Sequence, residues 1–146
     1  MPTGQLSNQQ QLVAVVNPVS QAAGNADTSW IDMASWERLQ AILLTGALGA
    51  SATVDFSVRQ ATDSGGTGAK ALSPAKAITQ MVKASDDNKQ AIIEVKASDL
   101  DLANSFRYVS FRTTVGTAAS LIAVAVLGDP EIKAPTKIST VNQIVT

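Results

Sequence analysis

Residues 106–128 read FRYVSFRTTVGTAASLIAVAVLG, and this stretch decides the fold that we expect for the chain. Two runs rich in β-forming residues flank the short break at 116–119, a pattern typical of a β-hairpin. The second run is apolar throughout, so we expect it to be covered on both faces. The first run alternates, so one of its faces should be buried and the other solvated. The predicted buried face consists of Val109, Phe111, Thr113 and Val115.

Turn residues divide the rest of the chain into further short, β-prone segments. Helix is the alternative for 33–44, where several residues favour helix, but we retain a strand there. The expected strands are 12–16, 38–46, 52–60, 76–82, 90–97, 106–115 and 119–128, with a further piece near 30–33. This pattern predicts an all-β protein, an antiparallel β-sandwich of the jelly-roll or Ig-like type with extended N- and C-terminal arms. The predicted organisation is an N-terminal arm at 1–28, a core domain at 29–129 and a C-terminal tail at 130–146.

Composition excludes several classes of function. The chain has 146 residues, a formal net charge of −1, and neither cysteine nor histidine. Disulfides and thiolate metal sites are therefore excluded, and the commonest general base is missing. Basic residues do not cluster as nucleic-acid binding requires. No apolar run approaches the ~20 residues that span a bilayer, and the first residues do not resemble a signal peptide. We expect no enzyme, no cofactor, no small-molecule substrate, and synthesis in the cytoplasm.

The two ends of the chain carry the candidate contact residues. The island Leu12, Val13, Val15 and Val16 lies in a polar, proline-punctuated leader. It is an ordinary first strand, an arm that pairs with a neighbouring subunit or partner, or part of a loose leader. The tail beyond Pro130 has too little apolar area to fold alone. The tail must stay loose, dock on its own domain or lie on a neighbour. Its apolar residues, the candidate contacts, are Ile138, Val141, Ile144 and Val145.

Other conspicuous residues have a structural interpretation. Trp30 and Trp36 are the only tryptophans. They either fill the end of the core or form an exposed pair that binds sugar or a partner. Tyr108 follows an acidic Leu-x-Leu link, and we predict a corner tyrosine whose hydroxyl bonds the upstream backbone. The glycine-rich tip at 63–68 lacks the spacing of a phosphate loop. Asp99 and Asp101 are interpreted as turn residues, not as a metal-binding pair.

The middle of the chain, roughly 28–130, resembles a family of small proteins encoded in the head-gene region of tailed bacteriophages. The resemblance rests on residues 29–33 (SWIDM) with 37–39 (ERL), on 52–63 (ATVDFSVRQATD) leading into GTGAK, and on the segments near 100–101, 108–109 and 126–129. It implies a capsid decoration, or cement, protein with a jelly-roll-like core and no catalytic residues. Such proteins sit on the shell at junctions between capsomers, often as dimers or trimers.

The leading expectation is therefore a virion structural protein on the capsid surface, bridging neighbouring capsomers. Its partners would be the major capsid protein and further copies of itself, with no role for nucleic acid or membrane. The alternatives are a carbohydrate- or receptor-binding sandwich on a fibre or tail, and a tail-tube or tail-completion subunit. A sugar-binding sandwich would need exposed aromatic side chains in a groove. The copy number per particle separates the head from the fibre interpretation.

Overall fold

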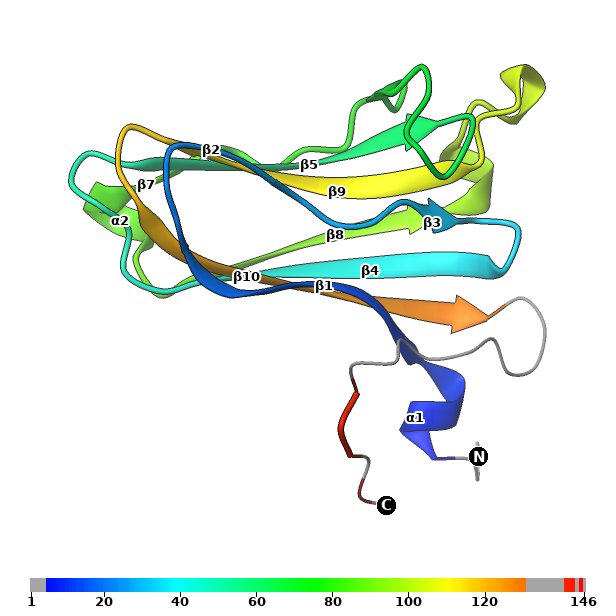
Figure 1. Cartoon of the computed structure of the whole chain (residues 1–146), viewed down its shortest axis with the longest axis horizontal. Coiled ribbons are helices and arrows are strands. Elements are labelled where there is room, and N and C mark those ends of the chain that lie inside the picture. Colours follow the sequence, from blue (N-terminus) through cyan, green and yellow to red (C-terminus); the bar gives the residue numbers. More distant parts are fainter. Residues whose placement is uncertain (1–4, 131–140, 144, 146) are drawn as a thin grey trace.

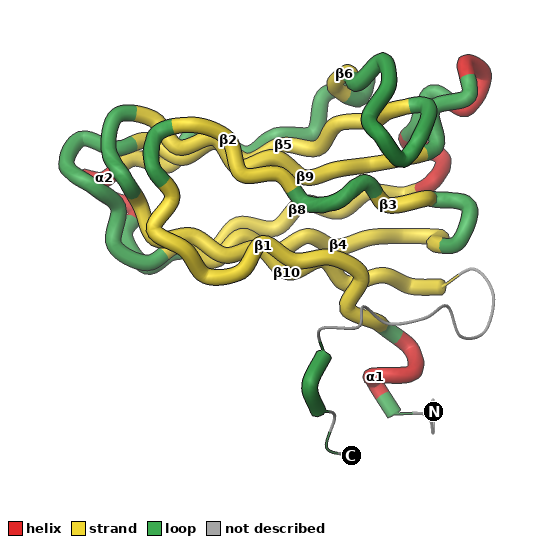
Figure 2. The backbone as a smooth tube through the Cα atoms, in the orientation of Figure 1, coloured by secondary structure: helices red, strands yellow, loops and turns green. Residues whose placement is uncertain are grey.

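A computed structural model describes residues 5–130, 141–143 and 145, and it shows two antiparallel β-sheets packed face to face (Figures 1 and 2). The strands are β1 (Gln11–Gln21), β2 (Gly24–Asp27), β3 (Ile31–Asp32), β4 (Trp36–Thr45), β5 (Thr53–Ala61), β6 (Lys70–Ala71), β7 (Met81–Val82), β8 (Gln90–Lys96), β9 (Tyr108–Gly116) and β10 (Ser120–Pro130). Short helical turns lie at α1 (Leu6–Gln9), α2 (Lys83–Asp86), η1 (Ala97–Asp99) and η2 (Leu102–Asn104). The predicted all-β sandwich is confirmed.

The strand order identifies the sandwich as a jelly roll. Sheet A has the order β1-β10-β4-β8, and sheet B has the order β2-β9-β5-β6, with β3 beside β9 and β7 beside β5. If β2 with β3 and β6 with β7 are each counted as one interrupted strand, eight strands remain, as in a jelly roll. In an Ig-like sandwich the first two strands share a sheet. Here β1 and β2 lie in different sheets, so the Ig-like alternative is wrong.

The strands β9 and β10, formed by the two runs of residues 106–128, do not form the hairpin that the sequence predicts. β9 pairs with β5 and β2 in sheet B, whereas β10 pairs with β1 and β4 in sheet A. The link between them crosses from one sheet to the other (Figure 1), and Thr117 in this link has a positive φ of 71°. Each strand therefore lies in the middle of a different sheet, and each turns its own apolar side chains toward the space between the sheets.

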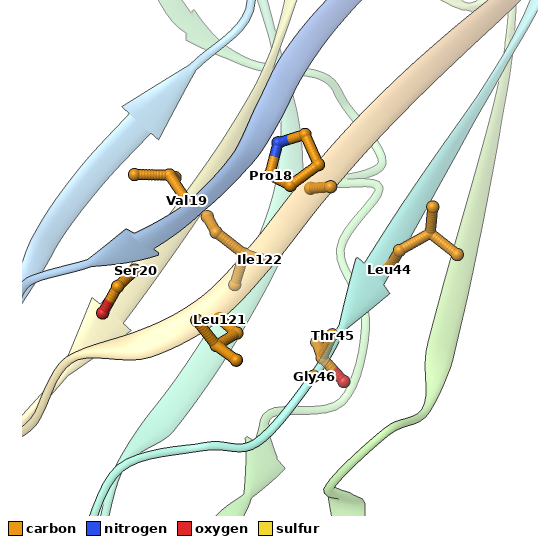
Figure 3. A pocket seen from close by; sticks show the side chains of 9 residues that line it. Pro18, Val19, Ser20, Leu44, Thr45, Gly46, Leu121 and Ile122 are labelled. Atoms are coloured by element: carbon orange, nitrogen blue, oxygen red, sulfur yellow. The ribbon is translucent and has the colours of Figure 1, made fainter.

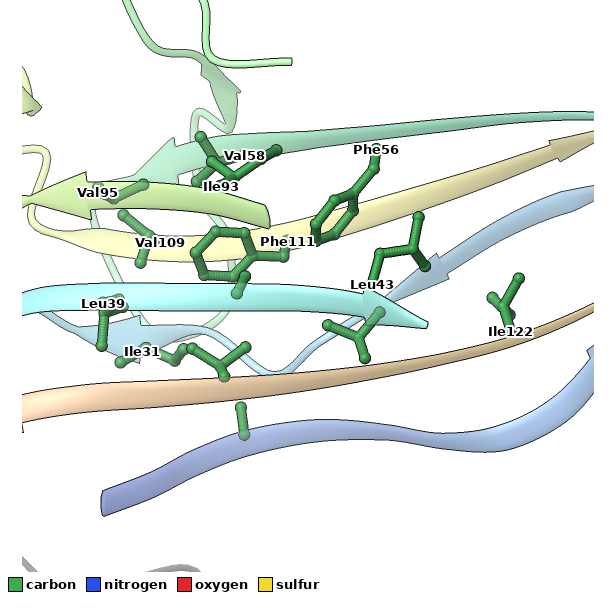
Figure 4. Close-up of a cluster of buried hydrophobic side chains, with 14 of the residues drawn as sticks. Ile31, Leu39, Leu43, Phe56, Val58, Ile93, Val95, Val109, Phe111 and Ile122 are labelled. Carbon is green, nitrogen blue, oxygen red and sulfur yellow. The ribbon is translucent and has the colours of Figure 1, made fainter. Parts of the chain in front are cut away.

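The strand faces within the sandwich agree with the sequence pattern. The predicted inward side chains of β9 are buried, with Phe111 fully so. Val54, Phe56 and Val58 of β5 are also buried, and the rings of Phe56 and Phe111 lie 6.1 Å apart between centroids. Leu39 and Leu43 of β4 belong to the same buried cluster (Figure 4). The core therefore lies between the two sheets, and both sheets contribute alternate residues to it.

Two parts of the predicted organisation are wrong. Most of the predicted N-terminal arm belongs to the sandwich, because 11–21 form β1 and 24–27 form β2, each paired within the chain. The strand predicted at 76–82 is reduced to β7, since only scattered backbone bonds, such as that from the Ile78 N–H to the Phe56 carbonyl, join the preceding residues to β5. The strands predicted near 30–33 and at 38–46 are confirmed as β3 and β4, with bounds that differ by one or two residues.

The ionised surface aspartates make the stability of the fold sensitive to acid. The Lys83 ammonium, 2.6 Å away, lowers the pKa of Asp87, and Lys70 does the same for Asp101 at 2.6 Å. A lowered pKa in the folded state adds stability above the ordinary carboxyl pKa, and this stability is lost as the pH falls through the folded value. Since the chain has no histidine, we expect a nearly constant Tm from about pH 8 to 6 and a fall below about pH 4.

Thermal scans by circular dichroism at a series of pH values test this expectation. Asp87→Asn removes one of the lowered carboxyl pKa values, so this variant should lose less stability on acidification than the parent protein. A steep decline of Tm between pH 8 and 6 would contradict the assignment.

Candidate functional site

The outward face of sheet B is polar and its side chains pair with one another. Arg112 on β9 binds Asp27 on β2 through two bonds of 2.7 Å. The Thr114 hydroxyl donates to the Asn25 side chain at 2.8 Å, and the Gln80 amide donates to Asp55 at 2.8 Å. This face is a solvated surface, with the polar-outside alternation of an antiparallel sheet that faces water.

The outward face of sheet A is apolar over much of its length. Leu44 of β4, Ile92 of β8 and Leu121 of β10 remain 44%, 55% and 48% exposed. The pairing register places smaller apolar side chains between them. We call this surface the apolar face, and its residues are Val15, Pro18, Ile42, Leu44, Ile92, Leu121, Ala123 and Ala125.

The apolar face corrects one expectation about β10. Its apolar run predicts a strand covered on both faces, and Ile122, Val124 and Val126 are indeed buried in the core. The alternate residues point away from the core, and Leu121 is among the most exposed large apolar side chains. Contiguous exposed apolar surface marks an interaction site in a soluble protein. The sequence predicts that β10 is covered on both faces, but the described residues cover only the face that points into the core.

A shallow hollow of about 430 Å³ lies at one end of the apolar face (Figure 3). Pro18 and Val19 border it on the β1 side, Leu44 borders it on the β4 side, and Leu121 and Ala123 of β10 line it between them. The lining contains few polar groups, as suits an apolar side chain better than a polar ligand.

The other end of the same face is charged. Arg38 of β4 donates to Asp129 of β10 at 2.6 Å, and this bond, with the charge of Asp129, raises the pKa of Arg38. Glu94 of β8 accepts from the Gln40 amide at 3.4 Å. Lys96 is two residues further along β8 and lies on the same face of the sheet. Opposite charges are balanced at this end, so the face as a whole has no strong electrostatic preference.

The predicted contact residues near the N-terminus lie on β1, at the edge of sheet A. Leu12, Val13, Val15 and Val16 are partly buried, and Val13 and Val16 pack against the core. Their strand pairs with β10 of the same chain, as an ordinary first strand does. The outer edge of β1 pairs with no other described strand, so its backbone groups on that side remain available.

The predicted contact residues near the C-terminus are described only in part. Ile138 and Ile144 lie outside the described residues. Val141 is half-buried, and Val145 is 83% exposed. In Figure 1, α1 and residues 141–143 lie on the sheet A side of the molecule.

The aromatic residues do not form an exposed platform. Trp36 is 6% exposed and belongs to the core. Trp30 is half-buried against Gly66, where an added Cβ would lie 2.6 Å from the indole Nε1. The Tyr108 hydroxyl is bonded to the Arg107 guanidinium at 3.2 Å and not to upstream backbone as predicted. The predicted tyrosine corner is therefore wrong, and the Arg107 guanidinium lies over the Tyr108 ring, 5.2 Å from its centroid.

The acidic side chains of two described loops are bound within or beside their own turns. Asp63 accepts from the N–H groups of Gly65 and Thr67, which makes the glycine-rich tip a closed turn. Asp99 and Asp101 bind separate lysines, Lys76 and Lys70. Within 5–130 and the described tail residues, no group of three acidic, histidine or cysteine side chains is placed to hold a metal ion. The same part of the chain contains no helix that is long and apolar enough to cross a bilayer.

Comparison with known proteins gives no family. No protein-family model matches the chain, and no curated protein matches it. Among solved structures it is similar to the SPBc2 prophage-derived protein YomS, with a TM-score of 0.43, 9% identity and coverage of 82% of this chain and 93% of that chain. It is also similar to a chain of Broad Bean Stain Virus, with a TM-score of 0.40, 7% identity and coverage of 93% of this chain and 96% of that chain. A family 11 carbohydrate-binding module from Clostridium thermocellum is similar with a TM-score of 0.38, 12% identity and coverage of 87% of this chain and 91% of that chain. The jelly-roll assignment rests on the strand order of the chain itself.

Proposed function

We propose that this protein is a virion structural protein of a tailed phage that decorates and stiffens the capsid shell by bridging neighbouring capsomers. The observation that carries the proposal is the contrast between the two outer faces of the sandwich. One is polar and internally paired, and the other is apolar with Leu44, Ile92 and Leu121 about half exposed. A protein with such a face functions when it is joined to another protein surface. The resemblance of residues 28–130 to head-region phage proteins supports the same function.

The sandwich suits a role as a rigid attachment. Its core spans both sheets, and its central strands β4, β5, β9 and β10 are each paired on both sides. Contacts to the major capsid protein would use the free edge of β1 by strand addition, with Leu12 and Val15 beside it, and the tail residues Ile138, Val141, Ile144 and Val145. Single contacts of this kind are weak, but repetition over a shell multiplies their effect.

The carbohydrate-binding alternative is not favoured by the site. It requires exposed aromatic rings in a groove, and Trp36 lies in the core while Trp30 covers the glycine-rich tip. The described acidic side chains are not gathered in a cleft, and several are bound to lysine or arginine at the surface. No specific observation favours a tail-tube subunit.

Quantitative mass spectrometry of purified particles tests the proposal through copy number. A decoration protein should be present in hundreds of copies per particle and should bind empty shells of the major capsid protein in a sedimentation assay. A variant lacking 138–146 should bind these shells several-fold more weakly with an unchanged Tm. The N-terminal deletion must stop at Gln10, because β1 begins at Gln11. Only a few copies per particle, together with no binding to shells, would contradict a decorating role.

A further inference from the structure

We infer that the apolar face packs against the same face of a second copy of this chain, about a two-fold axis that runs along the strands between β4 and β10. A rotation of this kind keeps each end of the face over the same end of the other copy. It also reverses the strand order, so β4 lies over β10 and β8 lies over β1 of the second copy. The inference deepens the proposed function, but its test does not depend on a capsid.

The side chains of β4 and β10 are complementary in size under this rotation. On β4 the outward residues are Ile42 and Leu44, and their neighbours on β10 are Ala125 and Ala123. Each large side chain of one copy would therefore face a small one of the other. Facing sheets pack well when large and small residues alternate across the interface. The hollow beside Leu121 is lined by Ala123, and it lies where Leu44 of the second copy would enter.

The charged end is complementary to itself under the same rotation. Arg38 on β4 and Asp129 on β10 are register partners, so each Arg38 would lie opposite Asp129 of the second copy. The bond within each chain, at 2.6 Å, would become part of a cluster with two positive and two negative charges. A two-fold axis across the strands would instead place this charged end over the apolar hollow, where the charges would be buried without partners.

The flat area of the sheet lies at the lower end of the range for dimer interfaces. β4 has ten residues, which at about 3.4 Å per residue gives a length of about 34 Å, and four strands about 4.8 Å apart span about 19 Å. The flat area is therefore about 600 Å² per copy before side-chain relief is counted, close to the roughly 800 Å² per partner of a standard interface. Such a dimer leaves both β1 edges free and so has two equal ends with which to bridge capsomers.

The first experiment measures the oligomeric state of the free protein by sedimentation velocity over a concentration series. We expect a dimer for the parent chain, and a rise of about 100-fold or more in the dimer dissociation constant for Ala123→Arg, because two arginines would be buried facing apolar side chains. Ser57→Arg is the matched control, since it adds the same charge to a central strand on the outer face of sheet B. It should dimerise like the parent. Circular dichroism establishes that both variants are folded.

The second experiment uses the absence of cysteine from the chain. One preparation carries Leu44→Cys and another carries Ala123→Cys. Facing sheets lie about 10 Å apart, beyond the span of a disulfide, so a short bis-maleimide is the linker. In the inferred dimer, Leu44 on β4 of one copy lies over Ala123 on β10 of the other. We therefore expect cross-linked dimers when the two preparations are mixed. The Ser57→Cys preparation alone should give none, because Ser57 lies on the outer face of sheet B, away from the interface in both copies.

The outcomes separate this inference from the proposed function. A monomeric parent chain at high micromolar concentration would overturn the inference, as would a dimer that Ser57→Arg disrupts and Ala123→Arg does not. Binding of that monomer to shells would leave the decorating role in place. A dimer that has the predicted cross-link but ignores shells would support the inference and contradict the decorating role.

Discussion

Phe111→Ala is expected to lower the free energy of unfolding by about 3–5 kcal/mol. Phe111 is fully buried on β9, at the centre of the space between the two sheets, and its ring packs against Phe56. Removal of the ring leaves a cavity that the neighbouring strands cannot fill, because β9 is held on both sides by β2 and β5. At roughly 2–4 °C per kcal/mol for a chain of this length, the Tm should fall by about 6–20 °C.

Leu102→Ala is the control for this substitution. Leu102 lies on the short turn η2 and is 55% exposed, so its truncation should change the free energy of unfolding by no more than about 0.5 kcal/mol. Chemical denaturation followed by tryptophan fluorescence measures both variants under one set of conditions. Similar losses for the two would show that Phe111 does not occupy the core.

The burial of Phe111 illustrates what could be predicted from the sequence. Alternation with a period of two is a local property of the chain, so the inward faces of β5 and β9 could be read directly from residues 53–60 and 106–115. The partners of each strand are not local. A short link after Gly116 is compatible with a hairpin and also with a crossing between sheets. Only the packing of the whole chain places β9 and β10 in different sheets.

The same limit explains why the apolar face was not predicted as a site. The signal was present, because Ile42, Ile92 and Leu121 occupy alternate positions on three strands that the sequence had located. These strands are far apart in the chain, so their shared face is visible only once the order β10-β4-β8 is known. The sequence also cannot tell whether an apolar strand is covered by its own chain or by a partner. For that reason the sequence leaves open whether Val13 and Val16 belong to an arm or to a first strand, and the structure shows that they pack against their own core.

Gly128→Ala is expected to lower the free energy of unfolding by about 1–3 kcal/mol through overpacking. Gly128 lies on β10 beneath the indole of Trp36, and an added Cβ would collide with that ring and lie 2.6 Å from the Val13 side chain. Neither neighbour can withdraw easily, because Trp36 is buried at the start of β4 and Val13 is held on β1. The ring must therefore move, and a shift in tryptophan fluorescence should accompany the loss of stability.

Gly65→Ala is the matched control, since it adds the same methyl group to the exposed glycine-rich tip. The nearest atom to the added Cβ would be Asp63 Oδ1 at 3.3 Å, so we expect little change, or a gain of up to about 1 kcal/mol because alanine restricts the unfolded chain. Equal stability of the two variants would show that Trp36 does not close over Gly128. The collision also lies next to Asp129 in the chain, so Gly128→Ala should weaken the dimer more than its loss of stability alone explains. Sedimentation velocity at a temperature where the variant is fully folded separates these two effects.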